Sequence, residues 1–130
     1  MIGDKDDLVK YRIERAKETL EDAKLLIESK RWNSAINRLY YSAFYVVIAL
    51  LLNENHKTTT HNGVKSIFSE QFIKKNIISQ EFGKRYSQLF TWRQKGDYAD
   101  LFDFTEENVL PYYDFVKSFI PQIEKIINNY

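Results

Sequence analysis

The chain has 130 residues, and its 19 basic and 18 acidic side chains leave a formal net charge of +1. This length predicts one domain over residues 1–130, and the balanced charge gives no overall attraction for nucleic acid, so any RNA contact must be local. The lack of cysteine excludes disulfides, thiolate catalysis and cysteine-based zinc sites.

The order of apolar residues predicts helices and gives little support for strands. Only four glycines and two prolines punctuate the chain, and no extended alternation of apolar and polar residues is bounded by turn residues. The first helix is expected from about residue 5 to residue 29, after acidic residues that suit the positive end of its dipole. Its apolar seam is Val9, Ile13, Ala16, Leu20, Ala23 and Ile27.

The second helix follows a short basic connection, Lys30 and Arg31, which predicts an antiparallel hairpin. At about 100° per residue, its apolar side chains cover two opposite flanks. One flank carries Trp32, Ile36, Leu39, Ala43, Val47 and Leu50, and the other carries Tyr41, Tyr45, Ile48 and Leu52. We therefore expect a central helix whose second flank cannot be hidden by one monomer's own bundle, and which a second subunit or another partner covers.

Three further helices complete the predicted all-α fold. A threonine of residues 58–60 can cap the third helix, whose inner side chains are Val64, Ile67, Phe68 and Phe72. Ser79 can cap the fourth, which Gly96 is expected to interrupt. Thr105 starts the fifth, in which Pro121 is expected to cause a kink.

Targeting and membrane segments are not expected. The first residues, MIGDKDDLVK, lack the apolar core of a signal peptide, and the longest apolar run, residues 46–52, is too short to span a bilayer. The sequence therefore predicts a cytoplasmic protein without membrane contact.

Common catalytic templates are absent from the sequence. It contains no GxSxG elbow, P-loop or GxGxxG motif, and no cofactor is implied. The two histidines, His56 and His61, are five residues apart, whereas two metal ligands on one helix face need a spacing of three or four. We therefore expect no metal site, with His61 capping or packing in the first turn of the third helix and His56 solvated.

Two polar groups of residues are candidates for ligand binding. The first is Arg38 with Tyr41, one helical turn apart beside the second flank of the central helix. The second is Trp92, Arg93, Lys95, Gly96, Asp97 and Tyr98. Two interpretations stay open for this segment. Either an Arg93–Asp97 ion pair locks a turn with Tyr98 packed over it, or Arg93 and Lys95 bind phosphate while Trp92 or Tyr98 stacks on a base.

At these residues the sequence resembles the HEPN domains, small helical domains named for nucleotide binding in higher eukaryotes and prokaryotes. The most specific parts of the resemblance are AINRLYYSAFY at residues 35–45, HNGV at residues 61–64, and the spacing of Arg93, Asp97 and Tyr98. The resemblance covers nearly the whole chain. It implies an antiparallel up-down bundle of four or five helices that commonly dimerises, often with a minimal nucleotidyltransferase encoded as its companion.

The resemblance also bears on catalysis. Some HEPN proteins are metal-independent ribonucleases in which an arginine, followed four to six residues later by a histidine, forms the active site across a dimer. Here Asp97 and Tyr98 stand where those enzymes carry histidine chemistry. What carries over is Arg93, Asp97 and Tyr98 as the candidate catalytic cluster.

The leading hypothesis is therefore a nucleotide- or RNA-binding module that forms a homodimer through its second or fourth helix and acts with a nucleotidyltransferase. Its predicted contact residues are Arg93, Lys95, Trp92, Arg38 and Tyr41. One alternative is an endoribonuclease toxin that uses Arg93, Asp97 and Tyr98 and is silenced by modification of Tyr98. The other is a purely structural helical adaptor.

Overall fold

The computed structural model describes residues 4–98 and 103–129, with the backbone alone for residues 95–98. Every regular element in these ranges is helical, which confirms the all-α class. The elements in chain order are α1 (Lys5–Glu28), α2 (Trp32–Asn53), α3 (His61–Phe68), η1 (Ser69–Ile73), α4 (Gln80–Tyr98) and α5 (Glu106–Asn128). The short η1 segment is a π-helical continuation of α3.

Three of the helices begin where the sequence predicts their caps. The hydroxyl oxygens of Thr60, Ser79 and Thr105 each accept a hydrogen bond from the backbone N–H three residues later. Asn108 returns a bond from its side-chain oxygen to the N–H of Thr105, which completes a capping box at α5. Each cap satisfies a backbone donor that the helix itself cannot pair, and is worth about 1 kcal/mol.

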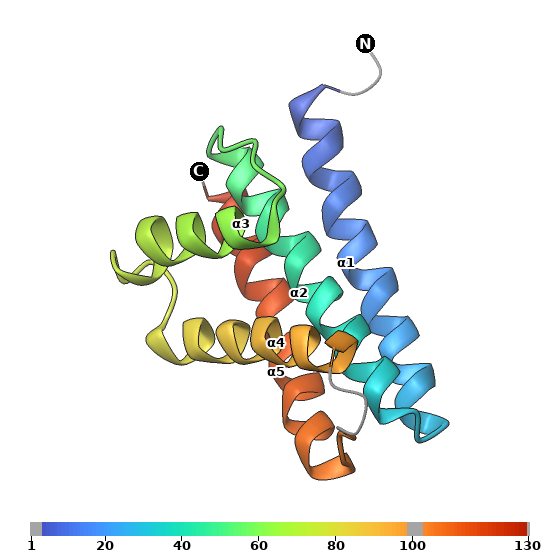
Figure 1. Cartoon of the computed structure of the whole chain (residues 1–130). Helices are drawn as coiled ribbons and strands as arrows, with labels where there is room; N and C mark the ends of the chain where they lie inside the picture. The colour runs from blue at the N-terminus through green and yellow to red at the C-terminus, as the bar shows by residue number, and fades with distance from the viewer. Residues whose placement is uncertain (1–3, 99–102, 130) are drawn as a thin grey trace.

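The first two helices form the predicted antiparallel hairpin (Figure 1). The hydroxyl of Ser42 in α2 donates a 2.7 Å hydrogen bond to the carbonyl oxygen of Ala16 in α1. Near the far end of the pair, the Lys5 ammonium lies 3.3 Å from the carbonyl oxygen of Asn53. The turn between the helices places Lys30 at a φ of 58°, a left-handed conformation that favours glycine.

Helix α2 is the centre of the fold, packed against α1, α3, α4 and α5. It is long and apolar enough to cross a membrane, but most of it is buried inside the bundle, as expected of a core helix. Contrary to expectation, Ile48 and Leu52 on its second flank are each only 6% exposed within this single chain. They are enclosed because α1 lies along that flank. Tyr41 and Tyr45 remain half-buried.

Helix α4 differs from the expectation at its C-terminal end. Its backbone remains helical through Gly96 as far as Tyr98, so Gly96 does not interrupt it. One glycine within a helix costs only about 1 kcal/mol relative to alanine, which continuing helical hydrogen bonds can offset. Helix α5 likewise runs on through Pro111 and Pro121, and the kink at Pro121 stays a prediction.

Helix α4 packs across the half of α2 that is lower in the view of Figure 1. Helices α1, α2 and α5 run roughly along one direction, whereas α3 and α4 lie across them (Figure 1). The C-terminal part of α4 therefore meets α2 close to the start of α5. Four of the predicted binding residues, Arg38 and Tyr41 of α2 and Trp92 and Arg93 of α4, lie at this junction.

Candidate functional site

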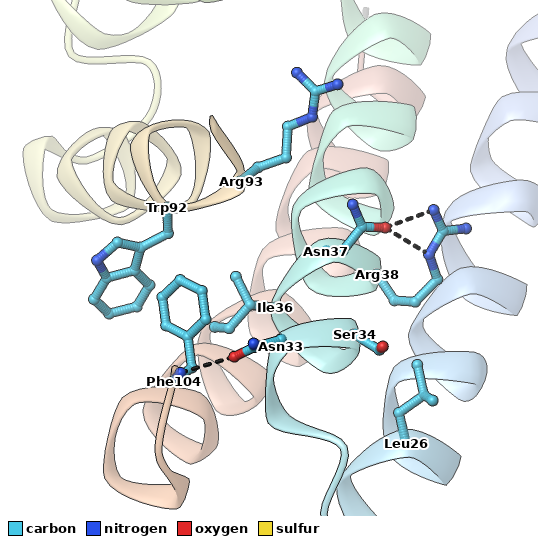
Figure 2. Close-up of a pocket in the computed structure, with 9 residues that line it drawn as sticks. All are labelled: Leu26, Asn33, Ser34, Ile36, Asn37, Arg38, Trp92, Arg93 and Phe104. Atoms are coloured by element: carbon cyan, nitrogen blue, oxygen red, sulfur yellow. Dashed lines mark hydrogen bonds between the residues drawn. The ribbon is translucent and has the colours of Figure 1, made fainter. Parts of the chain in front are cut away.

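A pocket of about 380 Å³ lies between the first turns of α2, the C-terminal part of α4 and the residue Phe104 that precedes α5 (Figure 2). It is lined by Leu26, Asn33, Ser34, Ile36, Asn37, Arg38, Trp92, Arg93 and Phe104. Three of the five predicted contact residues, Arg38, Trp92 and Arg93, therefore share one pocket.

The aromatic wall of this pocket is fixed by a long-range hydrogen bond. The side-chain oxygen of Asn33 accepts a 2.8 Å hydrogen bond from the backbone N–H of Phe104, and the Asn33 amide nitrogen donates to Asp103 at 3.2 Å. The ring centroid of Trp92 lies 5.4 Å from that of Phe104 and 4.8 Å from that of Tyr112, both edge to face. These contacts hold an aromatic surface at one side of the pocket.

The opposite side of the pocket carries Arg38. Its Nε and Nη2 atoms donate to the side-chain oxygen of Asn37 at 3.1 and 2.8 Å, and its guanidinium carbon lies 5.1 Å from the Tyr41 ring centroid. Because Arg38 occupies the oxygen of Asn37, the amide nitrogen of Asn37 points toward the side where Arg93 lies (Figure 2). The predicted pairing of Arg38 with Tyr41 is therefore present.

Arg93 reaches from α4 across to two tyrosines of α2. Its guanidinium carbon lies 5.9 Å from the ring centroid of Tyr40 and 5.6 Å from that of Tyr41, both within cation–π range. The Arg93 side chain is half-buried. The Tyr41 ring thus contacts both Arg38 of α2 and Arg93 of α4, two arginines that are far apart in the sequence.

His61 lies against the same two tyrosines. Its ring centroid is 5.6 Å from that of Tyr40, 5.8 Å from that of Tyr41 and 4.6 Å from that of Phe44. Its Nδ1 atom is hydrogen-bonded to the Tyr40 hydroxyl at 2.7 Å. Burial and the neighbouring charge of Arg93 lower the pKa of His61, so the imidazole is neutral at pH 7. The predicted packing role in the first turn of α3 is confirmed, while the cap itself is Thr60.

Two phenols lie behind His61 in the core. Burial raises the pKa of Tyr40 to about 12. Tyr86 of α4 is only 1% exposed, and its ring centroid lies 6.1 Å from that of Tyr40. Burial, and then the proximity of Tyr40, raise the pKa of Tyr86 well above its ordinary value. Both hydroxyls therefore keep their protons throughout the physiological range.

The predicted catalytic cluster is only partly described. Arg93 is placed as above, whereas the side chains of Lys95, Asp97 and Tyr98 lie outside the described residues, as does the predicted Arg93–Asp97 ion pair. The proposed turn of Asp97 and Tyr98 back toward Arg93 at a helix break is wrong, because the backbone there is still helical.

Sequence reasoning did not include Asn33, Asn37, Tyr40 and Phe104 among the residues of the site. It considered His61 as a capping or packing residue, but not as a neighbour of Arg93. The spacing of four between Asn33 and Asn37 places both on one helix face, and this signal could have indicated a polar lining. Nothing in the sequence showed that the start of α3 lies near the C-terminal part of α4, because this proximity depends on how both helices pack against Tyr40 and Tyr41 of α2.

The chemistry of the lining favours an anionic ligand. The oxygens of Asn33 and Asn37 are both occupied by internal hydrogen bonds, while the guanidinium groups of Arg38 and Arg93 and the amide nitrogen of Asn37 are donors. Guanidinium groups bind phosphate and carboxylate oxygens, and the ring of Trp92 beside them can stack on a base. Within residues 4–94 and 103–129, His, Asp and Glu side chains form no group of three arranged to hold a metal ion.

Known proteins are similar in sequence to this chain over most of its length. A protein of Thermotoga maritima named "UPF0332 protein" is 40% identical over 128 residues, which cover 98% of this chain and 97% of that protein. Methanocaldococcus jannaschii "Putative toxin MJ0142" is 35% identical over 95 residues, or 73% of this chain and 65% of that one. A second protein of that organism, "Putative toxin MJ0605", is 36% identical over 87 residues, or 67% of this chain and 65% of that protein.

The sequence profile described as HEPN domain matches residues 9–126, which extend from the second turn of α1 to the last turn of α5. This range contains every described residue of the pocket and of the Tyr40–His61 contact. The chain belongs to the HEPN domain family.

Proposed function

We propose that this chain is a toxin-type HEPN module that binds a nucleotide or a short single-stranded RNA segment between α2 and α4, and that it acts with a minimal nucleotidyltransferase. The observation that carries the proposal is the position of Tyr41, whose ring contacts both Arg38 of α2 and Arg93 of α4 at the edge of an aromatic pocket. Two M. jannaschii relatives with toxin in their names support the toxin type.

The two ends of the pocket suit the two parts of a nucleotide. Arg93 and Arg38, with the amide of Asn37 between them, supply charge-assisted donors for a phosphate. Trp92, held by Phe104 and Tyr112, supplies a ring on which a base can stack. Since a net charge of +1 provides no general attraction, affinity must depend on these few local contacts.

The test is the binding of a fluorescein-labelled, five-nucleotide oligouridylate, measured by anisotropy at low salt. The Arg93→Ala variant should lose about tenfold or more in affinity, the usual loss when a charged hydrogen bond of about 1.5–3 kcal/mol is removed. The matched control is Lys84→Ala, which removes a positive charge from an exposed position of the same helix outside the pocket. Equal affinity of the wild type and both variants would contradict the proposal and favour a structural adaptor.

The partner is tested separately from the ligand. A small nucleotidyltransferase encoded beside this chain, and a stable complex on co-expression with it, are the expected findings in a cytoplasmic two-component system. We expect the chain itself to form a homodimer, because Tyr41 and Tyr45 leave an aromatic strip half-buried on α2. Sedimentation at micromolar concentration that gives only a monomer, with no change on adding the nucleotidyltransferase, would contradict both expectations.

A second candidate function, metal-independent RNA cleavage, is favoured by one observation. Arg93 and His61 pack against the same rings, Tyr40 and Tyr41, and a neutral imidazole beside a guanidinium is the pair needed to move the 2′-hydroxyl proton and stabilise the phosphorane charge. Incubation with total RNA should then yield 2′,3′-cyclic phosphate ends that disappear in Arg93→Ala and His61→Ala. Cleavage that persists in both variants would point to a contaminant.

A further inference from the structure

We propose that His61 is a second anion-contacting residue of this site, and that the binding of a phosphate beside Arg93 takes up one proton on its imidazole while Tyr40 and Tyr86 act as positioning residues. This inference rests on the proposed binding function, and it adds a residue and a proton linkage that binding alone does not require.

The position of His61 is the first argument. The histidine ring and the Arg93 guanidinium approach the same pair of rings at similar distances, 5.6 and 5.9 Å for Tyr40 and 5.8 and 5.6 Å for Tyr41. Both side chains are half-buried, so each retains contact with solvent. An anion that meets the exposed part of Arg93 over these rings is therefore also near the exposed part of His61.

The hydrogen bond from Tyr40 sets which nitrogen of His61 faces outward. Because the Nδ1 atom is paired inward with the Tyr40 hydroxyl at 2.7 Å, the atom left for a ligand is Nε2. The buried Tyr86 hydroxyl is close enough to that of Tyr40 for each to affect the other's pKa, and it has no hydrogen bond of regular geometry among the described residues. The fewest buried protons lack an acceptor when the Tyr86 hydroxyl donates to the Tyr40 oxygen and the Tyr40 hydroxyl donates to Nδ1 of His61. The imidazole proton is then on Nε2, which faces outward.

The same chain of hydroxyls can accommodate a charged imidazole. When His61 takes up a proton, Nδ1 becomes a donor to the Tyr40 oxygen, and the Tyr40 proton turns toward the oxygen of Tyr86. A hydroxyl group can serve as donor or acceptor, whereas a phenylalanine at position 40 can do neither. The buried and otherwise unexplained hydroxyl of Tyr86 thus has a role as the exchange partner of Tyr40.

A bound phosphate supplies the driving force. In the empty site burial and the charge of Arg93 both lower the pKa of His61. An anion between the two side chains offsets the arginine charge and favours the imidazolium. On α2 the titratable side chains that contact His61 are Tyr40 and Tyr41. On α3 the next basic residue is Lys65, one turn further on, and its ammonium lies over the Phe90 ring of α4, 4.7 Å from the centroid. Within residues 4–94 and 103–129, no carboxylate lies within 4.0 Å of His61, and a bound phosphate would bring a negative charge to it.

The test uses the wild-type protein first. A 2′-O-methyl pentauridylate, which cannot be cleaved through its 2′-oxygen, and inorganic sulfate, a tetrahedral anion that does not itself titrate in this range, are titrated by calorimetry near pH 6.5 in two buffers of different ionisation enthalpy. A dependence of the binding heat on the buffer, with the sign of proton uptake, is expected for both probes. In parallel, NMR should show a rise in the pKa of His61 when the probe is bound.

Two variants assign the proton. His61→Gln should abolish the buffer dependence, and His56→Gln should keep it. Tyr40→Phe retains the ring but removes the hydrogen bond, and should change both the pKa of His61 and the proton uptake while leaving circular dichroism unaltered.

The failures of the two proposals are distinguishable. Arg93-dependent binding without buffer dependence, and with an unchanged pKa of His61, would overturn the proton linkage and leave the binding function intact. No Arg93-dependent binding of either probe would overturn the binding function, and the proton linkage with it.

Discussion

Asn33, in the first turn of α2, accepts a 2.8 Å hydrogen bond from the backbone N–H of Phe104, 71 residues further along the chain. The bond ties the start of α2 to the residue before the α5 cap and sets the aromatic wall of the pocket. Asn33→Ala leaves that N–H unpaired, so we expect a loss of about 1–3 kcal/mol in the free energy of unfolding, together with weaker RNA binding. Urea unfolding and anisotropy measure the two effects.

A substitution that adds a charge at position 33 tests the role of the contact between Asn33 and Asp103. Asn33→Asp keeps an acceptor for Phe104 but places a carboxylate beside Asp103, whose oxygen lies 3.2 Å from the Asn33 amide nitrogen in the wild type. The single variant should be destabilised by repulsion, and adding Asp103→Asn should restore much of the loss. If the double variant is no more stable than the single one, the contact between Asn33 and Asp103 is not responsible.

Asn37 allows the anion preference of the pocket to be tested without removing an arginine. Asn37→Asp keeps the oxygen that Arg38 contacts, but replaces the outward amide nitrogen by a second carboxylate oxygen. We expect unchanged or slightly higher stability and a strong loss of RNA affinity, because the new charge repels phosphate. The slope of log affinity against log salt should fall by about 0.7 for each phosphate of the single strand that the protein no longer neutralises. Asn53→Asp, at the far end of α2, should change neither the RNA affinity nor the salt slope.

The fold could be predicted from the sequence because its signals are local. The caps at Thr60, Ser79 and Thr105 and the seam of α1 depend on residues three or four positions apart, and the structure confirms them. Gly96 misled the prediction because glycine permits a helix end without requiring one. The enclosure of Ile48 and Leu52 depends on how closely α1 lies against α2, which hydrophobic spacing does not specify.

The site was less predictable because it depends on contacts between distant segments. Arg38 and Tyr41 share one helix turn, and their pairing followed from spacing alone. The approach of His61 to the surroundings of Arg93 requires the start of α3 and the C-terminal part of α4 to lie against the same two tyrosines of α2, a property of the tertiary fold. The charge of Arg93 therefore affects His61 although no Arg-to-His spacing in the sequence marks the pair.

The turn between α1 and α2 offers a stabilising substitution. Lys30 has a φ of 58°, and a residue with a side chain pays about 1–2 kcal/mol for this left-handed conformation. Lys30→Gly should therefore raise the free energy of unfolding by about 1 kcal/mol and the melting temperature by about 4 °C. Lys24→Gly, on the exposed side of α1, should lower stability by a similar amount. Destabilisation by both changes would contradict the left-handed turn.

Stability in mild acid should depend on His61. Because the folded pKa of His61 is below its ordinary value, the unfolded chain binds more protons between the folded pKa and about 6.5. The contribution of His61 is fully present above pH 6.5 and is lost as the pH falls through the folded pKa. His61→Gln should flatten the pH dependence of urea unfolding in this window, and His56→Gln should not. The same slope in both variants would assign the dependence to carboxylates.

Stability in alkali should depend on the two buried phenols. Burial raises the pKa of Tyr40 to about 12 and raises the pKa of Tyr86 well above its ordinary value, whereas both titrate near pH 10 in the unfolded chain. Above pH 10 the folded state therefore binds more protons than the unfolded chain. The contribution of the two phenols to stability is lost as the pH rises through their folded pKa values. Tyr86→Phe should remove part of this loss, while Tyr11→Phe, at a side chain that is 59% exposed, should leave it unchanged. Urea unfolding at increasing pH, with phenolate absorbance recorded in parallel, distinguishes the Tyr86→Phe variant from the Tyr11→Phe variant. Ionisation of Tyr86 before the chain unfolds would contradict its burial next to Tyr40.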